Sequence, residues 1–185
     1  HDRQLHLLDL QTGDLRQLTH GDHNPGAPQW SPDGSHLAFT RSDQLHLLPL
    51  AGGDAKPVDT GDLSPGWWTF SGENRIVFSA TPDAGKDDTA ANWKLDGAYK
   101  FEQDYTNAQL YVVTLETEKV DEITNGSDHI SDARYSAEAN AWLLVVAPTA
   151  DPYQGIVEGQ LVLVQDGKRE IIEAEPDCPG DMAWS

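Results

Sequence analysis

Short apolar runs separated by turn-forming residues recur along this chain. The run Leu37-Ala38-Phe39 directly follows the segment Trp30-Ser31-Pro32-Asp33-Gly34 and two polar residues. Within that segment proline presets φ, aspartate can bond its own backbone, and glycine takes a positive φ without strain. An apolar run on each side of such a turn is typical of two antiparallel strands. The pattern therefore predicts strand, tight turn and strand over residues 30–39.

The same order of apolar, turn and loop residues returns 40 residues later. Residues 5–34 align without a gap to residues 45–74. The clearest matches are Leu5-His6-Leu7-Leu8 with Leu45-His46-Leu47-Leu48, Gly13-Asp14 with Gly53-Asp54, Gly21-Asp22 with Gly61-Asp62, and Trp30-Ser31 with Phe70-Ser71. So many ordered matches at one spacing indicate an internal structural repeat.

Two further copies of the pattern follow. The third copy starts at Leu110, and Tyr135-Ser136 occupies the position of the first copy's Trp-Ser pair. Its turn keeps Asn140, a residue type that tolerates the left-handed backbone conformation. A fourth, partial copy covers residues 161–185. The repeat therefore extends over nearly the whole chain.

Each copy holds four short predicted strands in about 40 residues, which is typical of one blade of a β-propeller. The predicted fold class is all-β, a partial β-propeller of four-stranded antiparallel blades. A β-sandwich is the alternative all-β architecture. It predicts regular strand spacing but no aligned sequence copies, so the repeat favours the propeller.

The repeat divides the chain into blades of one incomplete propeller domain over residues 1–185. Three complete blades are expected, with part-blades at both ends. Their ranges are about 27–60, 66–124 and 131–174 for the blades, and 1–20 and 182–185 for the part-blades. A closed propeller needs at least about four blades. We therefore expect a fragment that is completed by a partner or by another copy of the chain, through its open blade edges.

Residues 81–108 interrupt the second complete blade. Their first part, 81–91, is rich in Asp, Gly and Ala and is predicted to be a solvated excursion. The following residues, 92–101, are aromatic and basic within an acidic chain. Their aromatic side chains either cap the hydrophobic edge of a blade or face a ligand or a neighbouring domain. The candidate substrate-facing or partner-facing residues are Trp93, Lys94, Asp96, Tyr99 and Tyr105.

Charge and composition exclude several partners. Twelve Lys and Arg residues stand against 31 Asp and Glu residues, which gives a net charge of −19. Such a surface repels phosphates, so neither nucleic acid nor an anionic membrane is an expected partner. The single cysteine, Cys178, allows no intrachain disulfide and fits a reducing compartment. We expect a cytoplasmic location, with a periplasmic one as the alternative.

No catalytic motif is present in the chain. The Gly-x-Ser-x-Gly pattern of a serine hydrolase nucleophile does not occur. Ser31, Ser71 and Ser136 each follow a repeat aromatic at the start of a turn, so turn hydrogen bonding explains them. His6 and His46 are expected to face outward from their strands. No ligand spacing indicates a metal site, and we expect no cofactor.

The run from Leu18-Thr19 through Trp30-Ser31-Pro32-Asp33-Gly34 and Leu37-Ala38-Phe39 to Leu45-His46-Leu47-Leu48 resembles known propeller repeats. They are those of TolB-type periplasmic proteins and of the N-terminal propellers of the prolyl oligopeptidase family. The resemblance covers nearly the whole chain and leaves both groups open.

The insertion favours the peptidases. The segment Trp93-Lys94-Leu95-Asp96-Gly97-Ala98-Tyr99 before Gln109-Leu110-Tyr111-Val112-Val113 is similar to one in acylaminoacyl-peptidase-like and dipeptidyl-peptidase-like members. The resemblance implies a non-catalytic propeller that covers a separate α/β-hydrolase domain, absent from this chain, and gates and positions peptide substrates for it. The alternative is a TolB-like propeller that binds a protein partner.

Overall fold

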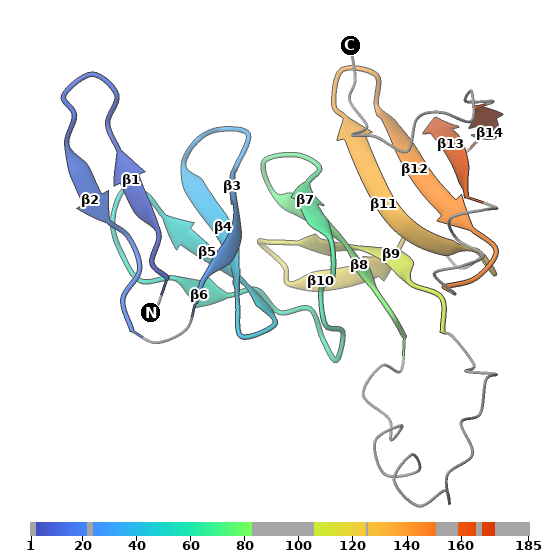
Figure 1. Cartoon of the computed structure of the whole chain (residues 1–185), viewed down its shortest axis with the longest axis horizontal. Coiled ribbons are helices and arrows are strands. Elements are labelled where there is room, and N and C mark those ends of the chain that lie inside the picture. The colour runs from blue at the N-terminus through green and yellow to red at the C-terminus, as the bar shows by residue number, and fades with distance from the viewer. Residues whose placement is uncertain are drawn as a thin grey trace, which may run out of the picture.

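The computed structural model describes residues 3–21, 24–82, 106–124, 126–150, 159–165 and 168–172. These residues form strands arranged in four antiparallel sheets that follow one another along the chain (Figure 1). Among the described residues no helix is long and apolar enough to cross a bilayer.

The first sheet has two strands, β1 (His6–Leu8) and β2 (Leu15–Gln17), and each of the other three has four. The second sheet contains β3 (Gly26–Trp30), β4 (His36–Arg41), β5 (Gln44–Pro49) and β6 (Lys56–Pro57). The third contains β7 (Trp68–Phe70), β8 (Arg75–Ala80), β9 (Gln109–Thr114) and β10 (Lys119–Glu122). The fourth contains β11 (His129–Ser136), β12 (Ala141–Ala147), β13 (Gln160–Gln165) and β14 (Lys168–Ile172). Neighbouring strands are consecutive in sequence, as in propeller blades, and the predicted fold class is confirmed.

The turn between β3 and β4 is held by its own side chains. The Gly34 N–H donates to the Ser31 carbonyl at 2.8 Å, and Gly34 has a φ of 70°. The Ser31 hydroxyl donates to Asp33 and accepts from the His36 N–H at 2.9 Å. In the corresponding turn of the fourth sheet, the Ser136 hydroxyl accepts from a backbone N–H. These hydrogen bonds confirm the predicted turn role of Ser31 and Ser136.

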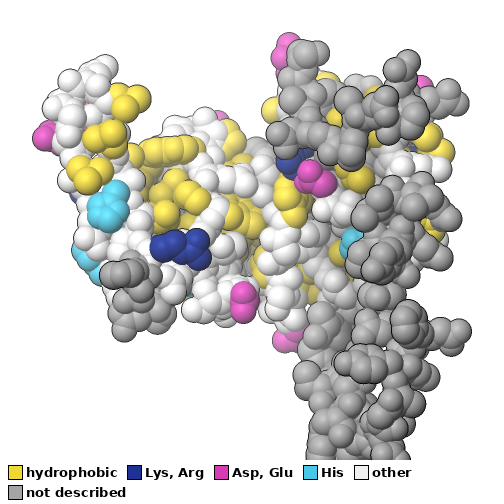
Figure 2. All heavy atoms as spheres, in the orientation of Figure 1, with side chains coloured by type: hydrophobic (Ala, Val, Ile, Leu, Met, Phe, Trp, Pro, Cys, Tyr) yellow, Lys and Arg dark blue, Asp and Glu magenta, His cyan; other side chains and the backbone are white. Residues whose placement is uncertain are grey.

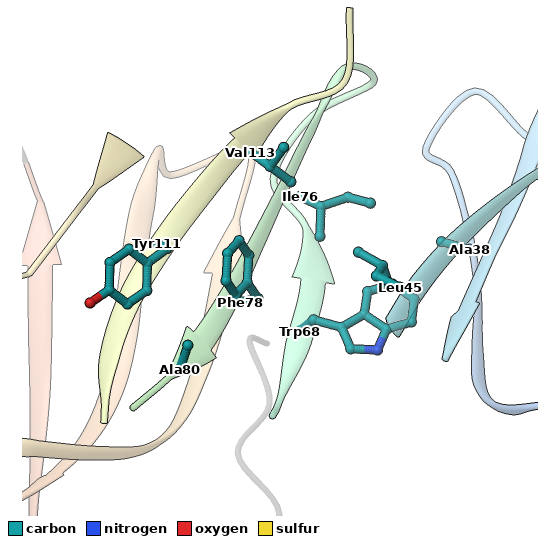
Figure 3. Close-up of a cluster of buried hydrophobic side chains, with 8 residues drawn as sticks. All are labelled: Ala38, Leu45, Trp68, Ile76, Phe78, Ala80, Tyr111 and Val113. Carbon is teal, nitrogen blue, oxygen red and sulfur yellow. The ribbon is translucent and has the colours of Figure 1, made fainter. Parts of the chain in front are cut away.

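The third sheet is buried on both faces, because it lies between two other sheets. In β8, side chains alternate between the faces, and every residue from Ile76 to Ala80 is buried. Figure 3 shows Ile76 and Phe78 on one face, with Trp68 turned toward Leu45 of the second sheet. Both faces of this sheet are thus covered by apolar contacts with other blades, whereas a lone antiparallel sheet has one face in solvent.

The opposite face of the third sheet packs on the fourth sheet. Val77 and Leu110 point away from Phe78 and contact residues of β11, β12 and β13. The buried residues contributed by the fourth sheet are Ile130, Ala133, Leu144, Val146 and Val162. Two hydrophobic clusters, one on each face of the third sheet, therefore join three consecutive blades.

The innermost strands of adjacent blades are joined by polar side chains. The Gln29 amide of β3 donates to the Trp68 carbonyl of β7 at 2.9 Å and accepts from the Thr69 hydroxyl at 3.1 Å. On the other side of the third sheet, the Arg134 guanidinium lies 5.7 Å from the centre of the Trp67 ring. These contacts set the spacing between blades at their inner ends.

The expectation that His46 faces outward is wrong. Its side chain is 3% exposed and stacks on Phe39, with ring centres 5.7 Å apart and planes at 17°. The Arg41 guanidinium lies 3.2 Å from its Nε2 atom. The His46 ring is covered because the neighbouring strand, β4, places the Phe39 ring beside it. This side of the strand therefore does not face solvent. His6, at the same repeat position, is exposed as expected.

We expect Phe78→Ala to lower the free energy of unfolding by about 3–5 kcal/mol, because it leaves a cavity between two blades. Phe78 is 0% exposed. Urea unfolding followed by tryptophan fluorescence measures the change. Leu10→Ala is the control, because Leu10 is 89% exposed and its truncation should change stability by no more than about 0.5 kcal/mol. Equal losses in the two variants would contradict the interblade core.

We also expect Asp33 to support the turn only while it is ionised. Hydrogen bonds from Ser31 and Ser35 lower the pKa of Asp33 from 3.8 to about 2. Because the folded pKa is depressed, the stabilisation is complete above about pH 4 and disappears as the pH falls to about 2. Asp33→Asn should therefore lower the melting temperature at neutral pH, and the difference from wild type should shrink over that acidic range. Asp43→Asn is the control; parallel pH profiles for the Asp33 variant and wild type would refute the role.

Candidate functional site

The insertion predicted from the sequence stands in place of a two-residue turn. In the second sheet, β4 and β5 are joined by Ser42 and Asp43, both with positive φ (51° and 60°), as in a tight hairpin. In the third sheet, Ala80 of β8 pairs with Gln109 of β9, and residues 81–108 lie between them. Since strand direction alternates, this connection leaves the sheet at the end opposite to the serine-containing turns.

The five candidate residues of the insertion, Trp93, Lys94, Asp96, Tyr99 and Tyr105, lie outside the described residues. The structure does describe the point at which the insertion rejoins the sheet. We call this segment and its contacts the insertion base: Asn107, Ala108, Gln109, Asp128 and His129. Its hydrogen bonds show how the end of the insertion is held.

Asn107 joins the insertion base to two loops of the fourth sheet. Its amide nitrogen donates to the Ser127 carbonyl and, at 3.3 Å, to the Pro148 carbonyl. Its amide oxygen accepts from the Ala150 N–H at 2.8 Å. One side chain thus fixes the end of the insertion to the next blade.

His129 holds the adjacent residue. Its Nδ1 atom accepts from the Ala108 N–H at 3.0 Å, and the Ala108 carbonyl accepts from the Ile130 N–H at 3.1 Å. Partial burial lowers the pKa of His129 below its ordinary value of 6.5, because burial disfavours the charged form. The neutral ring is also the form that the contact requires, since a protonated Nδ1 cannot accept.

Gln109 forms hydrogen bonds through both the nitrogen and the oxygen of its side-chain amide. The nitrogen donates to the Asp128 carbonyl at 2.8 Å, and the oxygen accepts from the Thr124 hydroxyl at 2.9 Å. That hydroxyl accepts in turn from the Leu110 N–H at 2.9 Å. The Gln109 side chain is 5% exposed, so these bonds satisfy polar atoms that water does not reach.

The insertion base is a network of hydrogen bonds beside a small hollow. The hollow beside it has a volume of about 70 Å³ and is lined by Asp128, Val146, Ala147, Pro148 and Gln160. Within the described ranges, no three His, Cys, Asp or Glu side chains gather to hold a metal ion. The described geometry attaches residues 107–109 to the next blade.

A second hollow, of about 380 Å³, lies at the opposite end of the sheets and brings a serine, a histidine and an aspartate together. The Ser35 hydroxyl lies 2.6 Å from His36 Nδ1 and 2.5 Å from an oxygen of Asp33. In a hydrolase triad the carboxylate orients the histidine, which takes the serine proton. Here the carboxylate accepts directly from Ser31 and Ser35, so the trio is a turn network.

Neither a family model nor a curated protein matches the sequence. Solved structures do match the fold. Oligogalacturonate lyase from Vibrio parahaemolyticus is 17% identical with a TM-score of 0.67, over 97% of this chain and 47% of that one. An acylaminoacyl peptidase of Pyrococcus horikoshii is 15% identical with a TM-score of 0.62, over 93% and 28%. TolB from Acinetobacter baumannii is 16% identical with a TM-score of 0.59, over 91% and 37%.

At these identities the likenesses show the fold alone. The fold is that of the β-propeller, and its structural neighbours include peptidases and TolB proteins, as the repeat resemblance implies. The chain spans less than half the length of each of the three structures compared above.

The sequence prediction missed the anchoring residues. Asn107 carries no repeat signal, because its partners lie in loops of a different blade. The bond from the Ala108 N–H to His129 does have a counterpart in the first copy, where the Arg3 N–H donates to Asn24 at the same separation of 21 residues. The pair Gln109 and Thr124 carries a repeat signal, since Gln4 and Thr19 stand at the same spacing in the first copy.

We expect acidification to loosen the insertion base through His129. Because its folded pKa is lowered, its contribution is complete above about pH 6.5 and is lost as the pH falls through the folded pKa. His129→Gln should therefore show a smaller loss of unfolding free energy than wild type between about pH 7.5 and 5. Urea titrations at a series of pH values measure this, with His6→Gln as the exposed control. A His129 variant with the wild-type pH profile would exclude this role.

Proposed function

We propose that this chain is the propeller portion of a serine peptidase of the prolyl oligopeptidase type. It carries no catalytic residues of its own and gates and positions peptide substrates for an α/β-hydrolase domain of the same protein. The observation that carries the proposal is the anchored insertion. A propeller blade that needs only a two-residue turn at this position instead holds residues 81–108, and Asn107 ties the end of that insertion to the next blade.

The chemistry of the insertion supports a contact role. Its aromatic residues Trp93, Tyr99 and Tyr105 offer large apolar area with few rotatable bonds, and Lys94 offers a cation in a chain of net charge −19. Long loops on a rigid scaffold are where binding residues concentrate. The likeness to an acylaminoacyl peptidase fold agrees with this role but does not select it.

The alternative is a TolB-like module that binds a folded protein partner. The likeness to TolB covers 91% of this chain and favours this reading as much as it favours a peptidase propeller. The sequence of the coding region around these residues separates the two. A following Gly-x-Ser-x-Gly with a later Asp and His supports the peptidase, and its replacement by other domains supports the binding module.

We expect the 185-residue chain to hydrolyse no aminoacyl or peptide substrate, and to bind a catalytic domain of the acylaminoacyl peptidase type. Isothermal titration measures binding, and release of p-nitroaniline from aminoacyl and peptidyl anilides measures hydrolysis. Trp93→Ala with Tyr99→Ala should weaken binding by about tenfold or more, because aromatic anchors carry much of an interface's energy.

Trp30→Ala is the matched control, because Trp30 is 52% exposed and belongs to β3 rather than to the insertion. Turnover by the chain alone would contradict the non-catalytic role. Binding that the paired substitution leaves unchanged would remove the insertion from the interface.

A further inference from the structure

The β1–β2 hairpin has the geometry of the outer half of a blade. His6 pairs with Gln17 in this hairpin, as His46 pairs with Pro57 at the offset of 40 and Tyr111 with Glu122 at the offset of 105. The three pairings thus share one register, so β1 corresponds to β5 and β9.

Hydrogen bonds beyond the strands repeat as well. The Leu5 carbonyl accepts from the Leu18 N–H at 2.8 Å, and the Leu110 carbonyl accepts from the Ile123 N–H at the same distance. The Thr19 hydroxyl accepts from the Leu5 N–H at 2.9 Å and donates to Gln4 at 2.8 Å. This matches the bonds that Thr124 makes in the third sheet. The hairpin therefore has the local structure that the outer half of a complete blade has.

What β1 lacks is the strand on its other side. β5 is paired with β4 and β9 with β8, whereas β1 pairs with β2 alone among the described residues. Because the backbone groups of Leu5 point to β2, those of His6 and Leu8 point to the open edge. Leu8 is 51% exposed, while Leu48 and Val113 at the same repeat position are 5% and 0% exposed.

Two of the three four-stranded sheets carry a ring at the position of His6, and they show what the open edge fits. In the fourth sheet Val162 stands at that position and pairs with Leu144. In the second sheet, Leu37-Ala38-Phe39-Thr40 lies opposite Leu48-Leu47-His46-Leu45. In the third sheet, Ile76-Val77-Phe78-Ser79 lies opposite Val113-Val112-Tyr111-Leu110. Strands β4 and β8 each place a phenylalanine opposite the residue equivalent to His6. In both strands this phenylalanine is flanked by aliphatic residues and a residue with a hydroxyl group.

Each of these phenylalanines stacks on a ring of its partner strand. The Phe39 and His46 centres are 5.7 Å apart with planes at 17°, and those of Phe78 and Tyr111 are 5.7 Å apart at 26°. The His6 Nδ1 atom lies 3.3 Å from the Gln4 carbonyl, as His46 Nδ1 lies 3.2 Å from the carbonyl two residues before it. The His6 ring is thus held by the same local contact as His46. Figure 2 shows hydrophobic and histidine side chains exposed over this hairpin.

We propose that the open edge of β1 binds an antiparallel strand of the pattern Leu/Ile-Ala/Val-Phe-Thr/Ser, with its phenylalanine stacked on His6. The strand belongs to a partner segment outside these 185 residues. Within the described part of the chain, the two strands with this pattern, β4 and β8, are already paired on both sides. The described part of a second copy therefore offers no free strand of this pattern. The inference goes beyond the proposed function, since a peptidase propeller and a binding module would share this edge.

A peptide of this chain's own residues 26–42, the β3–β4 hairpin with its flanking residue, is the probe. Added to the 185-residue protein, it should bind and shift the His6 ring protons upfield in the NMR spectrum, because they come to lie over a phenyl ring. The same peptide with Phe39→Ala should bind at least about tenfold more weakly, since it lacks the stacked ring and its buried area.

Two variants of the protein complete the test. His6→Ala should weaken binding of the parent peptide and make the protein indifferent to Phe39→Ala in the peptide, whereas His20→Ala, outside β1, should do neither. Leu8→Pro removes an N–H from the open edge and should abolish binding. Its urea unfolding transition should match the wild type, which shows that the interblade core is intact.

Three outcomes would overturn the proposal: no binding at millimolar peptide, equal binding of the two peptides, or binding without a shift of the His6 ring. Self-association of the protein alone that shifts the His6 ring would identify a second copy as the occupant and would likewise overturn it. None of these results bears on the insertion, so failure here is distinguishable from failure of the proposed function.

Discussion

Apolar contact between neighbouring sheets is the interaction on which the described structure depends. The third sheet shows it most clearly, because β8 buries Ile76 and Phe78 against one neighbour and Val77 against the other. Each sheet has at most four short strands, and none encloses a core by itself. Stability therefore comes from stacking of blades, and every exposed blade face or edge is a place where that stacking is incomplete.

This constraint explains which features the sequence could predict. The spacing of 40 residues and the turn at Trp30-Ser31-Pro32-Asp33-Gly34 are local, so strands, turns and blade type follow from them. The burial of His46 could not be predicted in this way, because alternation of apolar and polar residues normally indicates one solvent-exposed face. Here the Phe39 ring on the neighbouring strand covers the histidine. Hydrophobic alternation loses its meaning in a strand that is covered on both sides.

The insertion base was unpredictable for a different physical reason. Asn107 is held by groups in loops of another blade, at separations that no repeat fixes. His129 accepts from the Ala108 N–H as Asn24 accepts from the Arg3 N–H, but the two positions carry different residue types. Gln109 and Thr124 were within reach of sequence comparison, because Gln4 and Thr19 repeat their spacing and make the same bonds. These local contacts thus recur in the first and third copies of the repeat, whereas the contacts of Asn107 form only where two blades stack.

Local hydrogen bonding and burial are separated in the β1–β2 hairpin. The β1–β2 hairpin makes its hydrogen bonds and keeps the register of β9–β10, although no inner strand lies beside it in the described structure. The hydrogen bonds of this outer hairpin are thus present without an inner strand beside β1 among the described residues. Burial does need the inner strand, because Leu8 remains exposed where Leu48 and Val113 are covered. An outer hairpin is consequently a formed template whose unsatisfied edge selects the strand that completes it, and the selection is made by side-chain rings and aliphatic groups at fixed register.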